Sequence, residues 1–120
     1  IKVFNHGDMR RDFTYVDDIV TGILAARDKP PKKSDATTAP HRVFNIGNNH
    51  PEALLRLIAL LEDALGKKAE RILEPMQPGD VKETYADLTA IDRDLGFHPT
   101  TTIDDGIPKF VAWYRDYHNL

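Results

Sequence analysis

The segment from Gly7 to Asp18 reads G-D-M-R-R-D-F-T-Y-V-D-D and holds the side chains best suited to chemistry. A guanidinium presents a planar fork of permanently charged donors, which matches two phosphate oxygens in a way that a lysine ammonium does not. Arg10 or Arg11 could therefore bind a diphosphate. Spacing alone leaves an alternative, in which both arginines are solvated or paired with Asp8 and Asp12 as ordinary surface ion pairs.

Other polar residues fit structural roles better than catalytic ones. Asp17 and Asp18 are adjacent carboxylates at an expected helix start, where they offset the helix dipole and accept from free N–H groups. Asn45 and Gly47 lie between a predicted strand and a predicted helix, a geometry that can receive an anion but is also common in turns. The five histidines show no i,i+4 pair, so the sequence predicts no metal site.

The elements that position these groups alternate between strand and helix, which indicates an α/β arrangement. Residues 1–4 read as a strand, and the turn-forming residues 5–8 follow it. Apolar residues at helical spacing predict a first helix over 16–27, with Thr14 and Asp17 as a capping box.

The middle of the chain predicts a loop, a strand and a helix. Residues 29–41 are polar and rich in proline, which favours an exposed, mobile loop. The β-branched and aromatic run over 42–46 predicts a strand. Pro51 is placed in the first turn of the next helix, whose leucine-rich stripe ends at Gly66.

The last third of the chain predicts a strand over 69–73, a turn over 75–80 and a short helix over 88–95 between Asp87 and Gly96.

A final helix is predicted after a second capping box, formed by Thr102 and Asp105. Pro108 inside that helix would cost about 3 kcal/mol, so its regular part is expected after Ile107. Aromatic residues follow at helical spacing, a pattern more typical of a core or a docking surface than of a stacking platform: Trp113, Tyr114 and Tyr117.

The composition excludes several classes of function. The 120 residues, 41% hydrophobic and 29% charged, are typical of one globular domain. A net charge of −3 argues against a nucleic-acid partner. The longest apolar run, 53–61, is too short to span a membrane and contains Arg56. The absence of cysteine excludes disulfides and thiolate ligands, and it fits a reducing cytoplasm.

Several motifs in order resemble one enzyme family. The stretch 11–16 with Asp18 is similar to its R-D-[FY]-x-[YH]-V-x-D segment, and F-N-I-G at 44–47 is similar to its N-[IL]-G strand end. M-Q-P-G-D-V at 76–81 with Y-A-D at 85–87 is similar to its G-D-x(4-6)-A-D segment. The chain therefore resembles the extended short-chain dehydrogenase/reductase enzymes, specifically nucleotide-sugar epimerases of the UDP-glucuronate 4-epimerase type.

The resemblance implies the C-terminal, substrate-binding portion of an extended Rossmann-type epimerase, with short strands and about four helices. It implies a bound UDP-sugar whose diphosphate Arg11 holds. Gln77 stands where galactose-type relatives carry a second phosphate-binding arginine, and Thr84 stands where they place a tyrosine. Asp80 would brace its loop or accept from a substrate hydroxyl. The implied substrate-binding residues are Arg11, Phe13, Asn45, Gln77, Asp80 and Thr84.

The resemblance also implies parts that these 120 residues do not contain. The family binds NAD through a glycine-rich turn and uses a Tyr-x-x-x-Lys pair, and neither motif occurs here. We therefore expect an N-terminal NAD-binding domain outside this chain, no catalytic or cofactor-binding residue within it, and a chain that is inactive alone. The implied reaction is the interconversion of UDP-glucuronate and UDP-galacturonate at C4, in a homodimer formed through upstream helices. A 4,6-dehydratase, a decarboxylase, or a non-catalytic sugar-nucleotide-binding module stays open.

Overall fold

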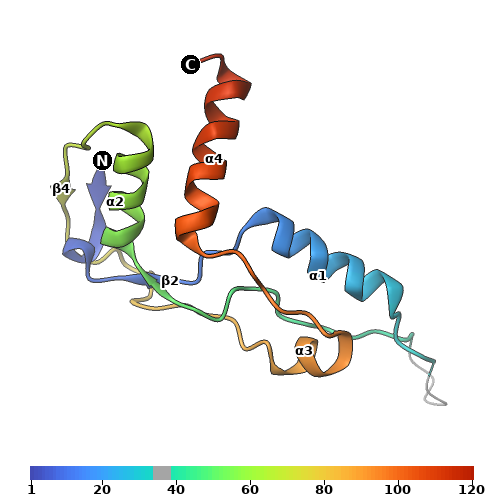
Figure 1. The fold of residues 1–120 in the computed structure, drawn as a ribbon. Coiled ribbons are helices and arrows are strands. Elements are labelled where there is room, and N and C mark those ends of the chain that lie inside the picture. The colour runs from blue at the N-terminus through green and yellow to red at the C-terminus, as the bar shows by residue number, and fades with distance from the viewer. Residues whose placement is uncertain (34–38) are drawn as a thin grey trace.

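The computed structural model describes residues 1–33 and 39–120, and it shows an elongated arrangement of short elements (Figure 1). The radius of gyration is 18.2 Å and the principal extents are 59 × 36 × 22 Å. A compact domain of this length has a radius of gyration of about 14 Å. The chain therefore buries less of its own apolar surface than its composition would permit.

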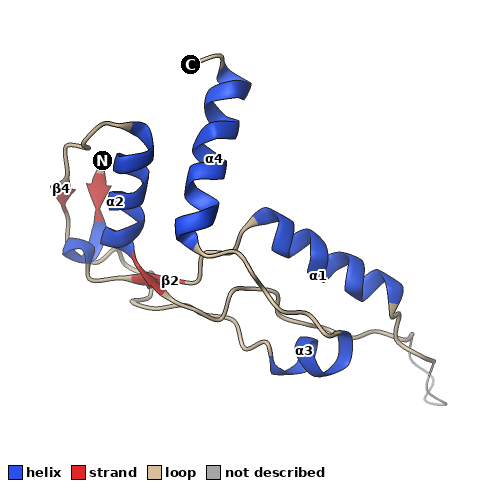
Figure 2. Ribbon diagram, in the orientation of Figure 1, coloured by secondary structure: helices blue, strands red, loops and turns tan. Residues whose placement is uncertain are grey.

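Short strands and four α-helices alternate along the described residues (Figure 2). The α/β class with short strands and about four helices is thereby confirmed. The elements are β1 (Lys2–Val3), a 3-10 segment η1 (Phe4–Gly7), β2 (Arg10–Arg11), α1 (Val16–Asp28), β3 (Glu52–Ala53), α2 (Leu54–Leu65), β4 (Ile72–Leu73), α3 (Thr89–Leu95) and α4 (Ile103–His118).

The strands form two separate pairs. β1 runs parallel to β4, with Val3 opposite Leu73, and β2 runs antiparallel to β3, with Arg11 opposite Glu52. The strands predicted over 1–4 and 69–73 are confirmed, although each is shorter than expected. The turn after β1 is also confirmed, and Gly7 adopts a positive φ of 85° in it.

The strand predicted over 42–46 is wrong, because the structure assigns neither helix nor strand to these residues. A strand requires a neighbour that completes its backbone hydrogen bonds. Among the described residues, no backbone hydrogen bond joins 42–46 to another segment. Of the loop predicted over 29–41, residues 34–38 lie outside the described part, and the described remainder carries no helix or strand.

Helix α1 confirms the prediction over 16–27, but the capping box expected from Thr14 and Asp17 is wrong. The N-cap is Tyr15, and it makes no side-chain cap hydrogen bond. Asp18 is buried and accepts hydrogen bonds from the backbone N–H groups of Thr100 and Thr101, at 3.2 and 3.0 Å. Burial raises the pKa of Asp18, but these amides outweigh that effect and hold the pKa below its usual value. A structural role of Asp18 is thus confirmed, but the N–H groups that it accepts from belong to residues 100 and 101 and not to the start of α1.

Helix α2 begins three residues later than Pro51 because β3 intervenes between them. The placement of Pro51 in the first helical turn is therefore wrong. The predicted end is confirmed, since Gly66 is the C-cap in the left-handed conformation that glycine favours. α2 lies beside α4, as Figure 1 shows, and Ile58 on α2 is only 7% exposed.

Helix α3 confirms the short helix predicted before Gly96, and the carboxylate of Asp87 accepts from the N–H of Thr89 at its start. Helix α4 begins at Ile103 rather than after Ile107, so the later start is wrong. The cap at Thr102 is confirmed, because its hydroxyl accepts from the N–H of Asp105, while the Asp105 carboxylate accepts from that hydroxyl.

Pro108 is tolerated within α4, where it leaves the carbonyl of Asp104 without a helical partner. The cap at Thr102 and the burial of Ile103 and Val111 offset that loss.

The main apolar core lies between α1 and α3 rather than around α2. Its buried members are Leu88, Ile91, Leu95 and Phe97, and side chains from α1 and from the segment 42–46 pack on it. The opposite face of α1 is exposed. The aromatic side chains on α4 are also exposed and stack on one another, so a core role for them is wrong: Trp113, Tyr114 and Tyr117.

Candidate functional site

Arg11 is held at the end of β2 by residues that the sequence places far away. Its Nη2 donates to Oδ1 of Asp80 at 2.7 Å, and its Nη1 donates to the carbonyls of Arg10 and Lys82 at 2.8 and 3.2 Å. A guanidinium has five N–H donors, so these contacts orient the fork and leave donors for an anion. The Arg11 side chain retains 24% of its exposure, which keeps the fork within reach of a ligand.

The ion pairs expected between the two arginines and Asp8 or Asp12 are wrong. Arg11 pairs with Asp80, and Arg10 lies 3.4 Å from Glu83. Asp8 pairs instead with Lys82. Residues 80–83 belong to a segment that pairs in parallel with Arg10, and their side chains take the place of Asp8 and Asp12 as partners of the two arginines.

Asp12 has a different role, which is to accept hydrogen bonds from the backbone. Its Oδ1 accepts from the N–H of Asn48, and its Oδ2 accepts from the N–H groups of Asn49 and Ala86, each at 3.0 Å. One half-buried carboxylate therefore joins β2 to two loops. Sequence reasoning considered Asp12 only as a partner for arginine, and nothing local in the sequence marks Asn48, Asn49 or Ala86 as its donors.

A polar hollow of about 450 Å³ lies beside Asp12. Two predicted site residues, Asn45 and Thr84, line it together. Asn45 donates to the carbonyl of Asp87 at 3.4 Å, and the backbone N–H of Thr84 donates to the carbonyl of Arg10 at 3.3 Å. The hollow thus offers a carboxylate, hydroxyls and an amide, which suit a polar ligand better than an apolar one.

Gln77 and Asp80 belong to one turn. The N–H of Asp80 donates to the carbonyl of Gln77 at 3.1 Å, and Gly79 between them has a φ of 83°. The same Asp80 carboxylate accepts from the N–H of Val81 at 2.8 Å. Asp80 thus braces its loop, which is one of the two roles predicted for it, and it joins the turn that contains Gln77 to Arg11.

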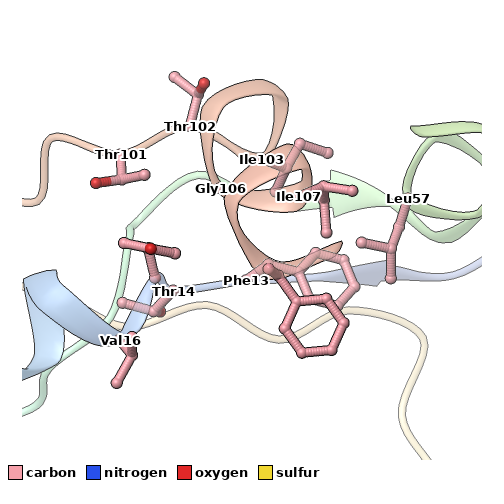
Figure 3. Close-up of a pocket in the computed structure, with 11 residues that line it drawn as sticks. Phe13, Thr14, Val16, Leu57, Thr101, Thr102, Ile103, Gly106 and Ile107 are labelled. Atoms are coloured by element: carbon pink, nitrogen blue, oxygen red, sulfur yellow. The ribbon is translucent and has the colours of Figure 1, made fainter. Parts of the chain in front are cut away.

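Phe13 lies apart from this group. It lines an apolar pocket of about 300 Å³, where it lies near Leu57 of α2 and Ile107 of α4 (Figure 3). Phe13 does not line the hollow that Asn45 and Thr84 share. Its role as a substrate contact stays a prediction.

The described residues offer neither a metal site nor a membrane-spanning helix. No group of three or more histidine, cysteine or acidic side chains in that part could hold a metal ion. No helix found in the same residues is both long enough and apolar enough to cross a membrane.

Comparison with known proteins identifies the family. A model of the GDP-mannose 4,6 dehydratase family matches residues 2–110. Protein CapI of Staphylococcus aureus is 47% identical over 128 residues, which cover 98% of this chain and 38% of that protein. UDP-glucuronate 4-epimerase 3 of Arabidopsis thaliana is 42% identical over 121 residues, which cover 96% of this chain and 28% of that enzyme.

A solved structure agrees with these relatives. UDP-glucuronic acid 4-epimerase from Bacillus cereus, in complex with UDP-glucuronic acid and NAD, superposes with a TM-score of 0.80 at 29% identity. The superposition covers 97% of this chain and 35% of that one, so the chain spans less than two fifths of the length of the relatives named here. The resemblance to nucleotide-sugar epimerases is confirmed. Since the family model matches almost the whole sequence, the chain belongs to the GDP-mannose 4,6 dehydratase family.

Proposed function

We propose that this chain is the nucleotide-sugar-binding part of an NAD-dependent 4-epimerase that interconverts UDP-glucuronate and UDP-galacturonate. The observation that carries the proposal is Arg11, whose guanidinium is oriented by Asp80. Arg11 directly precedes Asp12, which lines the polar hollow together with Asn45 and Thr84. Relatives that bear the name UDP-glucuronate 4-epimerase support this choice of substrate.

The contribution of these residues is binding and orientation. Arg11 would hold the diphosphate, and Gln77 could add a hydrogen bond without charge. The hydroxyls and amide around the hollow would bind the polar parts of the ligand. Fixing the UDP group in this way holds the sugar ring in position for the reaction. These residues therefore contribute by positioning the substrate and take no part in making or breaking bonds.

NAD does not fit the residues of this chain. The 120 residues include no glycine-rich turn that would let a pyrophosphate approach the backbone, and no tyrosine is followed by lysine four positions later. NAD and the catalytic pair would therefore belong to the remainder of a longer protein, and this chain alone would be inactive.

Exposed apolar surface supports the presence of such a remainder. On α1, Val16 is 62% exposed and Ile23 is 54% exposed, and the neighbouring segment 42–46 has no backbone partner within the described residues. Water is a poor environment for such surfaces, so further polypeptide is expected to cover them. As part of the same proposal, the complete enzyme is a cytoplasmic homodimer that assembles through helices outside this chain.

The proposal is tested with Arg11→Ala in the full-length protein. Loss of a charge-assisted contact of about 1.5 to 3 kcal/mol should weaken UDP-glucuronate binding by about 10- to 150-fold, measured by isothermal titration calorimetry. Arg27→Ala is the matched control, because Arg27 also pairs with a carboxylate but is 67% exposed on α1. Unchanged affinity in R11A would remove Arg11 from the site and overturn the proposal.

A dehydratase is the second candidate, and the description of the matching family favours it. Product analysis separates the two reactions, since an epimerase returns UDP-galacturonate of unchanged mass. A 4,6-dehydratase would release a product lighter by one water, and a decarboxylase would release carbon dioxide. Binding without any product would instead indicate a non-catalytic module.

A further inference from the structure

We propose that Asp12 is a positioning residue of the nucleotide-sugar site, which sets the geometry of the binding groups without touching the ligand's phosphates. The inference rests on the proposed function, because it assigns a task within that same site. Asp12 would align the loop that carries Asn45 and the loop that carries Thr84 with the strand that carries Arg11.

The first observation is that three segments meet at one carboxylate. Its two oxygens accept from the backbone N–H groups of Asn48, Asn49 and Ala86, all at 3.0 Å. Backbone amides, unlike side chains, are rigidly attached to the loops that they belong to. Each hydrogen bond to Asp12 therefore fixes the path of a loop rather than the orientation of one side chain.

The second observation is that Arg11 and Asp12 divide the neighbouring segments between them. The Arg11 guanidinium contacts the segment 80–82, whereas the Asp12 carboxylate contacts 48–49 and 86. Adjacent side chains on an extended backbone point to opposite sides, so this dipeptide reaches segments on both. A shift at Asp12 would therefore change the distance from Arg11 to Asn45 and to Thr84.

The third observation is the close packing of Gly47, which is buried at the wall of the hollow. A Cβ atom there would lie 2.4 Å from the Cβ of Ala86 and 2.7 Å from Oδ2 of Asp12. The φ of Gly47 is not positive, so glycine is required here for space and not for backbone freedom. The two loops thus lie so close to the carboxylate that only glycine, which has no side chain, fits at position 47.

Asp18 provides a comparison within the same chain. It is also a carboxylate that accepts from two successive backbone N–H groups, those of Thr100 and Thr101. It lines none of the hollow around Asn45 and Thr84. A substitution at Asp18 should therefore disturb the fold in a similar way and leave the geometry of the site alone.

The experiment compares Asp12→Asn with Asp18→Asn in the full-length protein. Asparagine has nearly the shape of aspartate, but its NH2 group would face a backbone N–H and repel it. Displaced loops would misalign the polar groups around the hollow, and the loss of one or two hydrogen bonds corresponds to about tenfold in affinity, so we expect D12N to weaken UDP binding by at least about tenfold. D18N should bind UDP with an affinity within about twofold of the wild type. Isothermal titration calorimetry measures all affinities at a temperature where every variant is folded.

Steady-state kinetics give a readout that general destabilisation would not move. In D12N the KM for the UDP-sugar should rise by at least about tenfold while kcat at saturation changes by less than about threefold, because the lost alignment affects the bound ground state and the transition state alike. A purely structural role would reduce the active fraction, and kcat would fall with KM unchanged.

Gly47→Ala is the second variant, and it keeps the test decisive if D12N folds poorly. The added methyl group would separate the same two loops with Asp12 intact, so it should raise KM in the same way. Equal weakening of UDP binding in D12N and D18N, or normal binding in both D12N and G47A, would overturn the inference. R11A distinguishes failure of the proposed function from failure of this inference. Normal UDP binding in R11A would overturn the proposed function itself. Weak binding in R11A together with normal binding in D12N would overturn only the role of Asp12.

Discussion

Helices α1 and α2 carry similar apolar stripes, but the two stripes lie in different environments. Ile58 of α2 is 7% exposed, whereas Ile23 of α1 is 54% exposed. One side of α1 is nevertheless packed tightly, since a Cβ at Gly22 would lie 3.0 Å from Ile46. α1 therefore has a covered side and an uncovered apolar side. An apolar stripe indicates that a face must be buried, but it does not indicate which segment buries it.

The two helices are anchored by the same kind of group. Asp18 near the start of α1 accepts from Thr100 and Thr101, and Glu62 near the end of α2 accepts from the N–H of Ala69 at 3.0 Å. Glu62 also pairs with Arg71 at 2.9 Å. Each helix is thus anchored by one of its own carboxylates, whereas coverage of the apolar faces depends on the rest of the protein.

The largest effect is expected from Phe97→Ala, which removes the covered side of α1. Phe97 is 2% exposed in the core between α1 and α3, so its truncation should lower the free energy of unfolding by about 3 to 5 kcal/mol. Urea unfolding of the full-length protein measures the change. A loss below about 1 kcal/mol would mean that this cluster is not a core.

A smaller effect is expected from Ile23→Ser in the full-length protein, which probes the uncovered side. If the remainder of the protein covers this face, the substitution should cost about 1.5 to 3 kcal/mol, because that is the value of burying such a side chain. Thr21→Ser on the same helix is the control and should stay within about 0.5 kcal/mol of the wild type. A loss for I23S as small as that of T21S would show that the face stays in water and would weaken the comparison with α2.

Thr102→Ala should lower stability by about 1 kcal/mol, by removing the cap that starts α4 and so loosening the partner of α2. Thr102→Ser keeps the hydroxyl and should restore most of the loss. Thermal unfolding of both variants tests this, and equal midpoints for alanine and serine would exclude a capping role.

The mildest perturbation is a change of pH. Hydrogen bonds from Arg71 and from the backbone of Ala69 lower the pKa of Glu62 from 4.5 to about 2. Because the folded pKa lies below the unfolded one, this stabilisation is complete above about pH 4.5 and is lost as the pH falls toward 2. Between those values, the urea midpoint of Glu62→Gln should depend less on pH than that of the wild type. Parallel profiles would mean that Glu62 is not the titrating group.

Local signals in the sequence predicted the C-terminal ends of α2 and α3 and the cap of α4, although the capping box at Thr14 and the helical turn at Pro51 were wrong. Gly66 and Gly96 each adopt the left-handed conformation that ends a helix, and Thr102 caps α4 as its hydroxyl predicted. These features depend on a few successive residues, so the sequence contains their cause. Predictions that needed a distant partner were less successful, such as the strand over 42–46 and the ion pairs of Arg10.

The candidate site shows the same division. The sequence by itself determined the turn around Gly79 and the α/β order, because these follow from residue types and short spacings. A phosphate-binding arginine stays a prediction from the same kind of signal. Only the tertiary structure decided that Asp80 holds Arg11, that Asp12 joins two loops, and that Phe13 lies in a separate apolar pocket. The physical reason is that hydrogen bonds and packing join atoms by distance in space, and the donors of Asp12 belong to loops that only folding brings to it.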